Sequence, residues 1–473
     1  MLKSDGIQVL YAQDLILFPV YLMVIILLAF FYRNIAYRNT PSGNYFLSAL
    51  AVKMMGGLAM GAVYIYYYNV GDTFYYYYDA QTFNNAIQES FGLFIKLLFL
   101  PANTITLSTY ESTRWLVYFN DPSGWTADKV YGLLSVVSFH SYPVMTILTA
   151  ALSFTGAWAL YRTFTDMYPG MYKQFALAIL FVPSVFFWGS GILKDSITFG
   201  CLGWMTYSAY LIFFKKRKIV RNFITLLLTS FLAIQIKPYI VISFLPALLF
   251  WIFFTYRSRI TNQFLRVVVG PVIFAFSLIS GYLLVVRLGE EYSKYSLQTV
   301  METVKNFHQW HAYLAENANA SGYSFGEFNG KWTGLISKIP AAINVTLFRP
   351  YLWEANNIVM VAAALESALI FAFTLYILIR NGIGRTIASI FTNPALFFCL
   401  FFSLVFAFAV GFSSYNFGAL VRYKIPCIPF FLAGLIILNY ETTLKRKNRE
   451  AEKELLRKRN IDIMTRRKIL AEE

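Results

Sequence analysis

The sequence contains little charge. Only 14% of its 473 residues are Asp, Glu, Lys or Arg, whereas soluble domains average about 25%. Hydrophobic residues make up 58% of the chain, and the mean hydropathy is +0.54. Apolar runs long enough to cross a bilayer recur along its length. This composition predicts an all-α protein, a polytopic bundle of transmembrane helices.

Cysteine and histidine are also scarce, with three of each. The cysteines fall inside apolar runs and the histidines lack zinc-ligand spacing, so neither a disulfide framework nor a zinc site is expected. A glycine-rich nucleotide loop is missing from the segments expected in the cytoplasm, which argues against direct use of a nucleotide sugar. The net charge of +16 is explained by basic cytoplasmic loops, so no nucleic-acid partner is expected.

The apolar runs predict about eleven spans. Two gaps between them, near 190–194 and 237–238, are short enough to be tight hairpins or breaks. The expected spans are 15–33, 46–67, 141–161, 174–189, 195–214, 222–236, 239–255, 266–286, 357–380, 390–412 and 422–439.

Basic residues predict the orientation of these spans. With the N-terminus outside, every inside connection is basic, and the Lys-Lys-Arg-Lys run at 215–218 is the strongest signal. Residues 440–473 hold eleven Lys or Arg against seven Asp or Glu. We therefore expect a transmembrane domain at 1–439 and a basic cytoplasmic tail at 440–473, in a multi-pass inner membrane protein.

Two large outer loops follow from this topology, at about 68–140 and 287–356. The stretch 91–100 is apolar but too short to cross, and it predicts a helix lying in the membrane interface. Tyrosine-rich clusters at 64–68 and 74–78 fit either an interfacial aromatic belt or a surface that stacks on sugars.

Basic residues at the outer membrane edge oppose the positive-inside rule. They occur at Lys194, Lys237, Arg349 and Arg422, with Lys424 close by. Because topology does not explain these basic residues, we expect them to bind an anionic lipid headgroup, above all a phosphate or pyrophosphate. Taken alone, Lys194 and its neighbour Asp195 could simply pair with each other.

Acidic residues are expected on the same side. Asp72 and Asp79 follow the second span and Glu354 follows Arg349, and an acid beside a phosphate site can act as a general base. The structural alternatives are a turn at Gly71-Asp72 and a helix cap at Asp79. A divalent metal is possible if Asp72, Asp79 and Glu354 converge.

Two charged residues fall inside expected spans. Glu366 is a functional candidate because carboxylates are costly in a membrane, although it could instead be a hydrogen-bonded helix contact. Lys53 lies near the inner end of its span, and we expect it to snorkel to the interface.

Four stretches carry a resemblance to a known family: GDTFYYYYDA (71–80), PSVFFWGSGILKDSITF (183–199), LFRPYLWE (347–354) and GALVRYKIPCIPFF (418–431). Together they resemble polyprenyl-phosphate-dependent membrane glycosyltransferases of the GT-C type and the related bacterial polysaccharide polymerases. The resemblance implies a bundle with an acidic first outer loop and a lipid-linked sugar donor held by basic residues at the outer edge.

The resemblance also implies roles for individual residues. Asp72 or Asp79 would be the catalytic base, and Lys194, Asp195, Lys237, Arg349, Glu354, Arg422 and Tyr423 would bind the polyprenyl-phosphate-linked donor. The chain has two expected spans before the acidic loop and two aspartates seven positions apart, where the family commonly has one span and an adjacent acidic pair. A polymerase, a lipid-linked glycan flippase and a non-catalytic subunit therefore remain open as alternatives.

Overall fold

The structure is a computed structural model, and it describes residues 3–4, 7–264, 267–272, 275, 323, 332–414 and 416–472. Within these residues the chain is helical, apart from two short paired strands near the N-terminus, β1 (Lys3–Ser4) and β2 (Ile7–Gln8). The expected all-α class is confirmed.

Eight helices of the described residues are long and apolar enough to cross a membrane, or nine if a bent pair counts as one span. The bent pair joins α19 (Phe417–Tyr423) to α20 (Ile428–Glu472) at an angle of 61°. The eight are α1 (Asp14–Ala36), α2 (Phe46–Val63) with its flanking turns, α7 (Tyr142–Met167), α10 (Lys194–Tyr210) with the turn after it, α11 (Ile219–Ile236), α12 (Pro238–Tyr256), α16 (Ile358–Asn381) and α18 (Pro394–Ser414).

One expected span, 174–189, is broken into two short helices, α8 (Tyr172–Ile179) and α9 (Pro183–Trp188). Helices α7 and α10 pack side by side and run in the same direction. An Asp166–Lys215 ion pair of 2.9 Å shows this, since it joins the end of α7 to the turn that follows α10. The chain must therefore return the length of the bundle between them, and α8 and α9 supply that return.

Glycines bring α7 and α10 into close backbone contact. A Cβ on Gly156 would lie 2.0 Å from the carbonyl oxygen of Gly200, and one on Gly203 would lie 2.0 Å from that of Gly156. Small residues at membrane helix interfaces let backbones approach in this way. Of the expected span 266–286, the structure describes only residues 267–272 and 275, which are helical, so the count of eleven is not confirmed.

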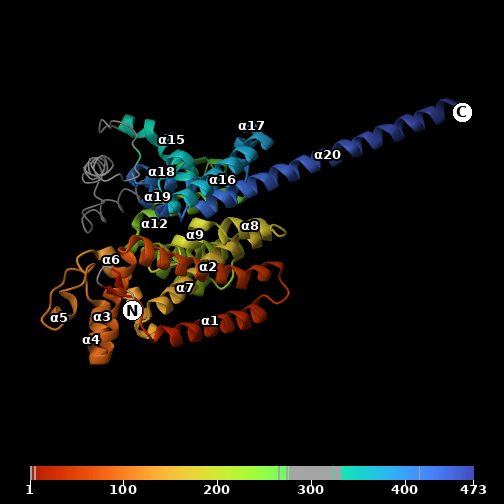
Figure 1. Cartoon of the computed structure of the whole chain (residues 1–473). Coiled ribbons are helices and arrows are strands. Elements are labelled where there is room, and N and C mark those ends of the chain that lie inside the picture. The colour runs from red at the N-terminus through yellow and green to blue at the C-terminus, as the bar shows by residue number, and fades with distance from the viewer. Residues whose placement is uncertain are drawn as a thin grey trace.

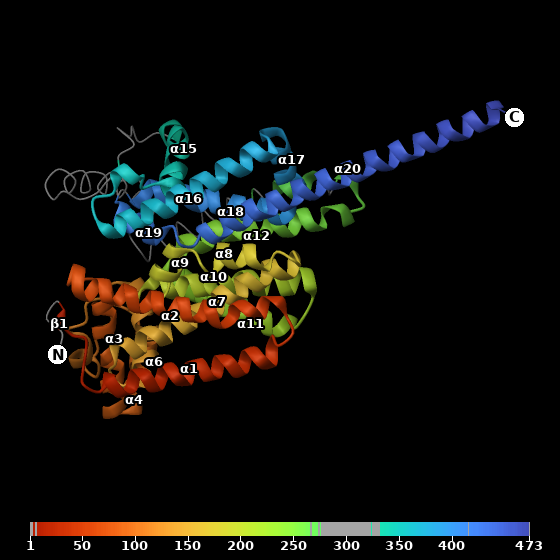
Figure 2. The same cartoon turned by 45° about the vertical axis from the view of Figure 1, so that its right-hand side comes forward.

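The bundle has two chemically different ends. At the basic end, where α7, α10 and α16 finish, Thr442 of α20 bonds Asn381 of α16 at 2.8 Å. The 215–218 run lies at this end, and α20 extends away from it as one long projecting helix (Figure 2). At the opposite end, which we call the site end, α7, α10, α12 and α16 begin.

The expected outer segment 68–140 folds into four helices at the site end: α3 (Asp72–Glu89), α4 (Phe91–Phe99), α5 (Tyr110–Thr113) and α6 (Pro122–Ser138). The expected helix at 91–100 is present as α4, which runs across the direction of the long helices (Figure 1). Its Phe91 and Phe99 side chains are exposed.

The second expected outer segment, 287–356, is described only in part. Its helix α15 (Trp332–Phe348) packs along α18, where Thr346 donates a hydrogen bond to the carbonyl oxygen of Ala407 at 2.7 Å. This part of the segment is therefore packed into the bundle. A short turn, η6 (Leu352–Glu354), connects it to α16.

Lys53 does not snorkel to the interface as expected. Its side chain is buried inside the bundle, and its Nζ donates a hydrogen bond to the carbonyl oxygen of Gly189 at 2.8 Å. The expectation rested on the position of Lys53 near the start of α2. It did not include α9, which packs against α2 and brings the carbonyl oxygen of Gly189 to the Lys53 side chain inside the bundle.

Candidate functional site

Asp195 lies at the centre of a charged cluster at the site end. It stands in the first turn of α10, and its side chain is only 2% exposed. Lys237, in the turn between α11 and α12, contacts one carboxylate oxygen at 2.5 Å, and Arg422 of α19 contacts the other at 3.0 Å. Two cations from distant segments therefore share one buried carboxylate.

Arg422 also joins Asp195 to the first turn of α3. Its Nη2 lies 2.9 Å from Oδ2 of Asp72, whose side chain is 40% exposed. Burial alone would raise the pKa of Asp72, but the Arg422 guanidinium, the Tyr118 hydroxyl and the charge of Lys194 lower it below its ordinary value. Asp72 is therefore ionised, and it is the more accessible carboxylate of this cluster.

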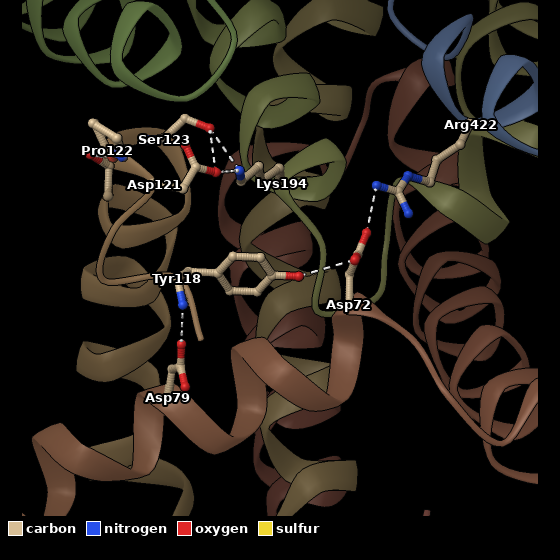
Figure 3. A network of polar contacts seen from close by, with 9 residues as sticks. Asp72, Asp79, Tyr118, Asp121, Pro122, Ser123, Lys194 and Arg422 are labelled. Atoms are coloured by element: carbon tan, nitrogen blue, oxygen red, sulfur yellow. Dashed lines mark hydrogen bonds and ion pairs between the residues drawn. The ribbon is translucent and has the colours of Figure 1, made fainter. Parts of the chain in front are cut away.

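Tyr118 connects Asp72 to a second ion pair (Figure 3). Its hydroxyl donates to Asp72 at 3.0 Å, and its ring lies 5.6 Å from the Nζ of Lys194. Lys194 pairs with Asp121 at 2.9 Å and bonds Ser123 Oγ at 2.7 Å. The adjacent residues Lys194 and Asp195 thus have different partners, and the simple pairing between them considered above does not occur.

Asp79 is fully buried and follows Asp72 by about two turns on α3. Its carboxylate accepts hydrogen bonds from the backbone N–H groups of Val117 at 3.1 Å and Tyr118 at 2.9 Å. Asp79 therefore holds the loop before α6 in the position that brings the Tyr118 hydroxyl to Asp72 (Figure 3).

A second buried carboxyl faces Asp79. Burial raises the pKa of Asp79 to about 6, against the lowering effect of its backbone hydrogen bonds. Burial and the Asp79 charge raise the pKa of Asp128, on α6, well above its ordinary value. Two carboxyls in one dry site cannot both ionise cheaply, so this pair retains a proton more readily than an exposed aspartate does.

Arg349 and Glu354 form a separate group. Arg349 Nε donates to Glu354 at 3.0 Å, and its guanidinium lies 5.0 Å from the ring of Phe417 at the start of α19. The carbonyl oxygen of Arg349 accepts from Lys424 at 3.2 Å and from Ser367 at 3.1 Å. Arg349 therefore contacts α19 through Phe417 and the bend between α19 and α20 through Lys424. The Arg349–Glu354 pair does not contact Asp195 directly.

A cavity of about 460 Å³ adjoins the charged cluster. Asp72, Arg422 and Tyr423 stand at its polar side, together with the helix-capping amides of Asn357 and Asn416. Its remaining lining is apolar or aromatic and divides into two groups: Tyr64, Tyr68, Val70 and Trp188 from η2 (Tyr64–Tyr68), the turn after it and α9, and Val359, Met360, Ala363, Gly418, Ala419 and Val421 from α16 and α19.

The structure brings together most of the residues singled out in the sequence. Asp72, Asp195, Lys237, Arg422 and Tyr423 form one cluster, in which the Lys237 ammonium also lies 4.8 Å from the ring centre of Tyr423. Lys194 reaches this cluster through Tyr118. Asp79, Arg349 and Glu354 stand outside the cavity lining.

Sequence reasoning missed Tyr118, Asp121 and Asp128. Asp121-Pro122-Ser123 carries a recognisable helix-start signal, and Asp121 does accept from Ser123 N at 3.2 Å as the cap of α6. That signal identifies the helix but not Lys194 as a partner, because nothing local links residues 121 and 194.

The described residues do not form the metal site considered for Asp72, Asp79 and Glu354. The convergence of Asp72, Asp79 and Glu354 that a metal would need does not occur, because Asp79 bonds backbone amides and Glu354 pairs with Arg349. Among the described residues, no three His, Cys, Asp or Glu side chains are grouped so that they could hold an ion.

Comparisons with known proteins do not assign the chain. No protein-family model, curated protein or solved structure matches it.

Proposed function

We propose that this protein is a membrane glycosyltransferase that moves a sugar from a polyprenyl phosphate carrier to an acceptor hydroxyl. The observation that carries the proposal is the shared guanidinium of Arg422, held by buried Asp195 on one side and by the more exposed Asp72 on the other, beside an apolar cavity. The proposal takes the basic end of the bundle as cytoplasmic, because Lys and Arg collect on cytoplasmic connections, and so assigns the site to the outer face of a bacterial inner membrane.

The cavity suits an amphipathic donor. Side chains of α16 and α19, among them Met360 and Val421, offer an apolar wall to a carrier tail, and Arg422 stands at the polar side where a phosphate would lie. The lining also carries Tyr64, Tyr68 and Trp188, whose aromatic faces fit the flat faces of a sugar.

The two partners of Arg422 are not equivalent. Asp195 is 2% exposed and also holds Lys237, whereas Asp72 is 40% exposed and reaches the cavity. A phosphate entering the cavity competes most readily for the Arg422 nitrogen that now contacts Asp72, because charge-assisted bonds to phosphate are strong. Asp195 keeps Arg422 and Lys237 in place during that exchange.

The exchange frees the base for the reaction. When Arg422 turns to the phosphate, the pKa of Asp72 rises, because the guanidinium that opposes the effect of burial is lost, and the carboxylate becomes a better proton acceptor. The acceptor oxygen then forms a bond to the anomeric carbon while the bond from that carbon to the phosphate oxygen breaks. The hydroxyl proton goes to Asp72, and the electron pair leaves with the phosphate, which Arg422 stabilises.

A reconstituted system tests this proposal. The protein is placed in vesicles with a panel of polyprenyl-phosphate-linked sugars and crude envelope acceptor, and release of free polyprenyl phosphate is measured with transfer of labelled sugar. In parallel, binding of farnesyl phosphate is measured, with farnesol and inorganic phosphate as controls. We expect coupled release and transfer that Asp72→Asn reduces by about 10²–10⁴-fold, and farnesyl phosphate binding that Asp72→Asn preserves.

Other outcomes identify the alternatives. Movement of labelled donor across the bilayer without release of carrier phosphate would indicate a flippase. Consumption of pyrophosphate-linked donors with growth of a lipid-linked chain would indicate a polymerase. Farnesyl phosphate binding that does not depend on Arg422 would contradict the proposed site itself.

A further inference from the structure

The short helix α9 forms part of the cavity wall, yet it lacks caps of its own. It has six residues, and its N-cap position is Val182, whose side chain offers no hydrogen bond. Backbone groups left without partners inside a membrane protein are costly, so such a break persists only where other segments satisfy them. Two buried charged side chains do this for α9, one at each end.

Glu366 of α16 caps the N-terminal end. Its two carboxylate oxygens accept from the backbone N–H and from the hydroxyl of Ser184, both at 2.6 Å. An N-cap residue normally supplies this acceptor from the helix's own chain. Here the acceptor comes from a residue 182 positions away, which gives the mid-span carboxylate a structural partner.

Lys53 of α2 caps the C-terminal end. Its Nζ donates to the carbonyl oxygen of Gly189, the residue that follows α9, and Ser153 Oγ of α7 donates to the same oxygen at 2.7 Å. Close packing supports this contact, because a Cβ on Gly56 of α2 would lie 2.1 Å from the carbonyl oxygen of Phe186. A negative group at the start and a positive group at the end also match the direction of the peptide dipoles.

We propose that Glu366 and Lys53 are positioning residues that fix α9 and, through it, the cavity wall and the charged cluster. Trp188, the last residue of α9, lines the cavity. Five residues after Gly189, the chain starts α10 with Lys194 and Asp195. A shift of α9 therefore moves both the aromatic wall and the carboxylate that holds Lys237 and Arg422.

This assignment separates two roles for Glu366. A proton carrier must change its protonation state, so Glu366→Gln would abolish function. A positioning residue needs only its hydrogen bonds, and a glutamine amide can accept from Ser184 N while donating to Ser184 Oγ. The proposal therefore predicts that Glu366→Gln is tolerated and Glu366→Leu is not.

Cysteine labelling tests the position of α9 without requiring the reaction. Trp188→Cys is introduced as a reporter, since the native Cys201, Cys399 and Cys427 are buried. We expect the labelling rate of this reporter by a small maleimide to rise about tenfold with Lys53→Met, because Gly189 loses a charged donor. Glu366→Leu should raise it similarly, Ser153→Ala should raise it less, and Glu366→Gln should leave it unchanged.

Two controls make the result specific. Lys96→Met removes a lysine from α4, far from α9, and should not change the labelling of the Trp188→Cys reporter. Ala419→Cys, a reporter on the α19 side of the cavity, should label at the same rate with and without Lys53→Met. Unchanged labelling of Trp188→Cys in both Lys53→Met and Glu366→Leu would overturn the proposal.

A further outcome concerns Glu366 alone. If Glu366→Gln leaves the labelling rate unchanged but abolishes sugar transfer or lipid movement, the carboxylate carries a proton and is not only a positioning residue. Because labelling is read independently of turnover, a failure of the proposed reaction would leave the test of α9 intact.

Discussion

Arg422 reaches Asp195 through its Nε at 3.0 Å and Asp72 through its Nη2 at 2.9 Å. One guanidinium thereby joins the start of α10 to the start of α3 across the polar side of the cavity. Since Asp195 is buried and Asp72 is accessible, the two contacts should respond differently to a bound anion.

Asp72→Asn should reduce sugar transfer by about 10²–10⁴-fold, the usual contribution of a general base. Binding of farnesyl phosphate should be unchanged or stronger, because Arg422 loses a competing carboxylate. Steady-state transfer and equilibrium binding check the two effects separately. Glu111→Gln is the matched control, since Glu111 pairs with Arg114 on α5, outside the cavity lining; an Asp72→Asn protein that transfers at the normal rate would exclude the base.

Arg422→Lys should weaken farnesyl phosphate binding by about tenfold or more, because a lysine cannot contact two partners with one planar group. Titration of the purified protein in detergent measures the dissociation constant. Arg114→Lys serves as the control, because it alters an arginine at the end of α5 whose side chain is 39% exposed and which is absent from the cavity lining. Equal binding by Arg422→Lys and the natural protein would place the anion elsewhere.

Lys237→Met should destabilise the protein by about 1–3 kcal/mol, because Asp195 keeps Arg422 but loses its other buried partner. The double variant Asp195→Asn with Lys237→Met should lose less than the sum of the two single changes. Thermal unfolding in detergent measures the cycle. The exposed pair Glu454–Lys458 is the control, and its cycle should yield no more than about 1 kcal/mol. Strict additivity at Asp195 and Lys237 would mean that the contact is not energetically coupled.

The Asp79–Asp128 pair should make stability fall as pH rises. The pKa of Asp79 is raised to about 6, above that of an unfolded aspartate, so the folded state binds the proton more tightly. The bound proton contributes about 3 kcal/mol to the free energy of unfolding. This contribution is complete below about pH 4 and is lost as the pH rises through about 6. Unfolding temperatures measured from pH 5 to pH 8 should fall in the natural protein.

Asp128→Asn should flatten this pH dependence, because the asparagine amide can donate to Asp79 and removes the facing carboxyl. The gain in stability should be larger at pH 8 than at pH 5. Glu111→Gln should leave the slope as it is in the natural protein. A slope that Asp128→Asn does not alter would show that the facing carboxyls are not its source.

The orientation predicts which surface positions react from outside. Leu107, in the segment between α4 and α5 at the site end, is fully exposed, and Leu107→Cys should react with a membrane-impermeant maleimide on intact cells. Arg217→Cys, at the basic end, should react only after permeabilisation. The opposite pattern would place the cavity in the cytoplasm and remove the argument for an outer-face reaction.

Much of the fold was predictable from local composition. The long apolar runs identified the eight helices that can cross a membrane, and the short run at 91–100 identified α4. The prediction of one continuous span at 174–189 was less accurate. The stretch is mostly apolar, but it contains Pro183, which begins α9 and has no backbone N–H to donate. Glu366 accepts from Ser184 at the start of α9 and Lys53 donates to Gly189 beyond its end, both from other helices.

The site was predictable by residue type and only partly by grouping. Basic residues at the outer edges pointed to Lys194, Lys237 and Arg422, since positive charge there conflicts with topology. The choice between Asp72 and Asp79 could not be made from the sequence, because both lie in one tyrosine-rich stretch just after the second expected span. In the structure one faces the cavity and the other is buried against the backbone of Val117 and Tyr118.

The sequence by itself determined that the chain is a helical membrane protein, because burial of apolar runs and placement of charge are set by composition over short windows. Only the tertiary structure decided which charges meet. Asp72 and Arg422 are separated by 350 positions, and their contact depends on how each helix is rotated and packed against its neighbours. That arrangement is fixed by all of the interfaces together, so no local pattern reports it.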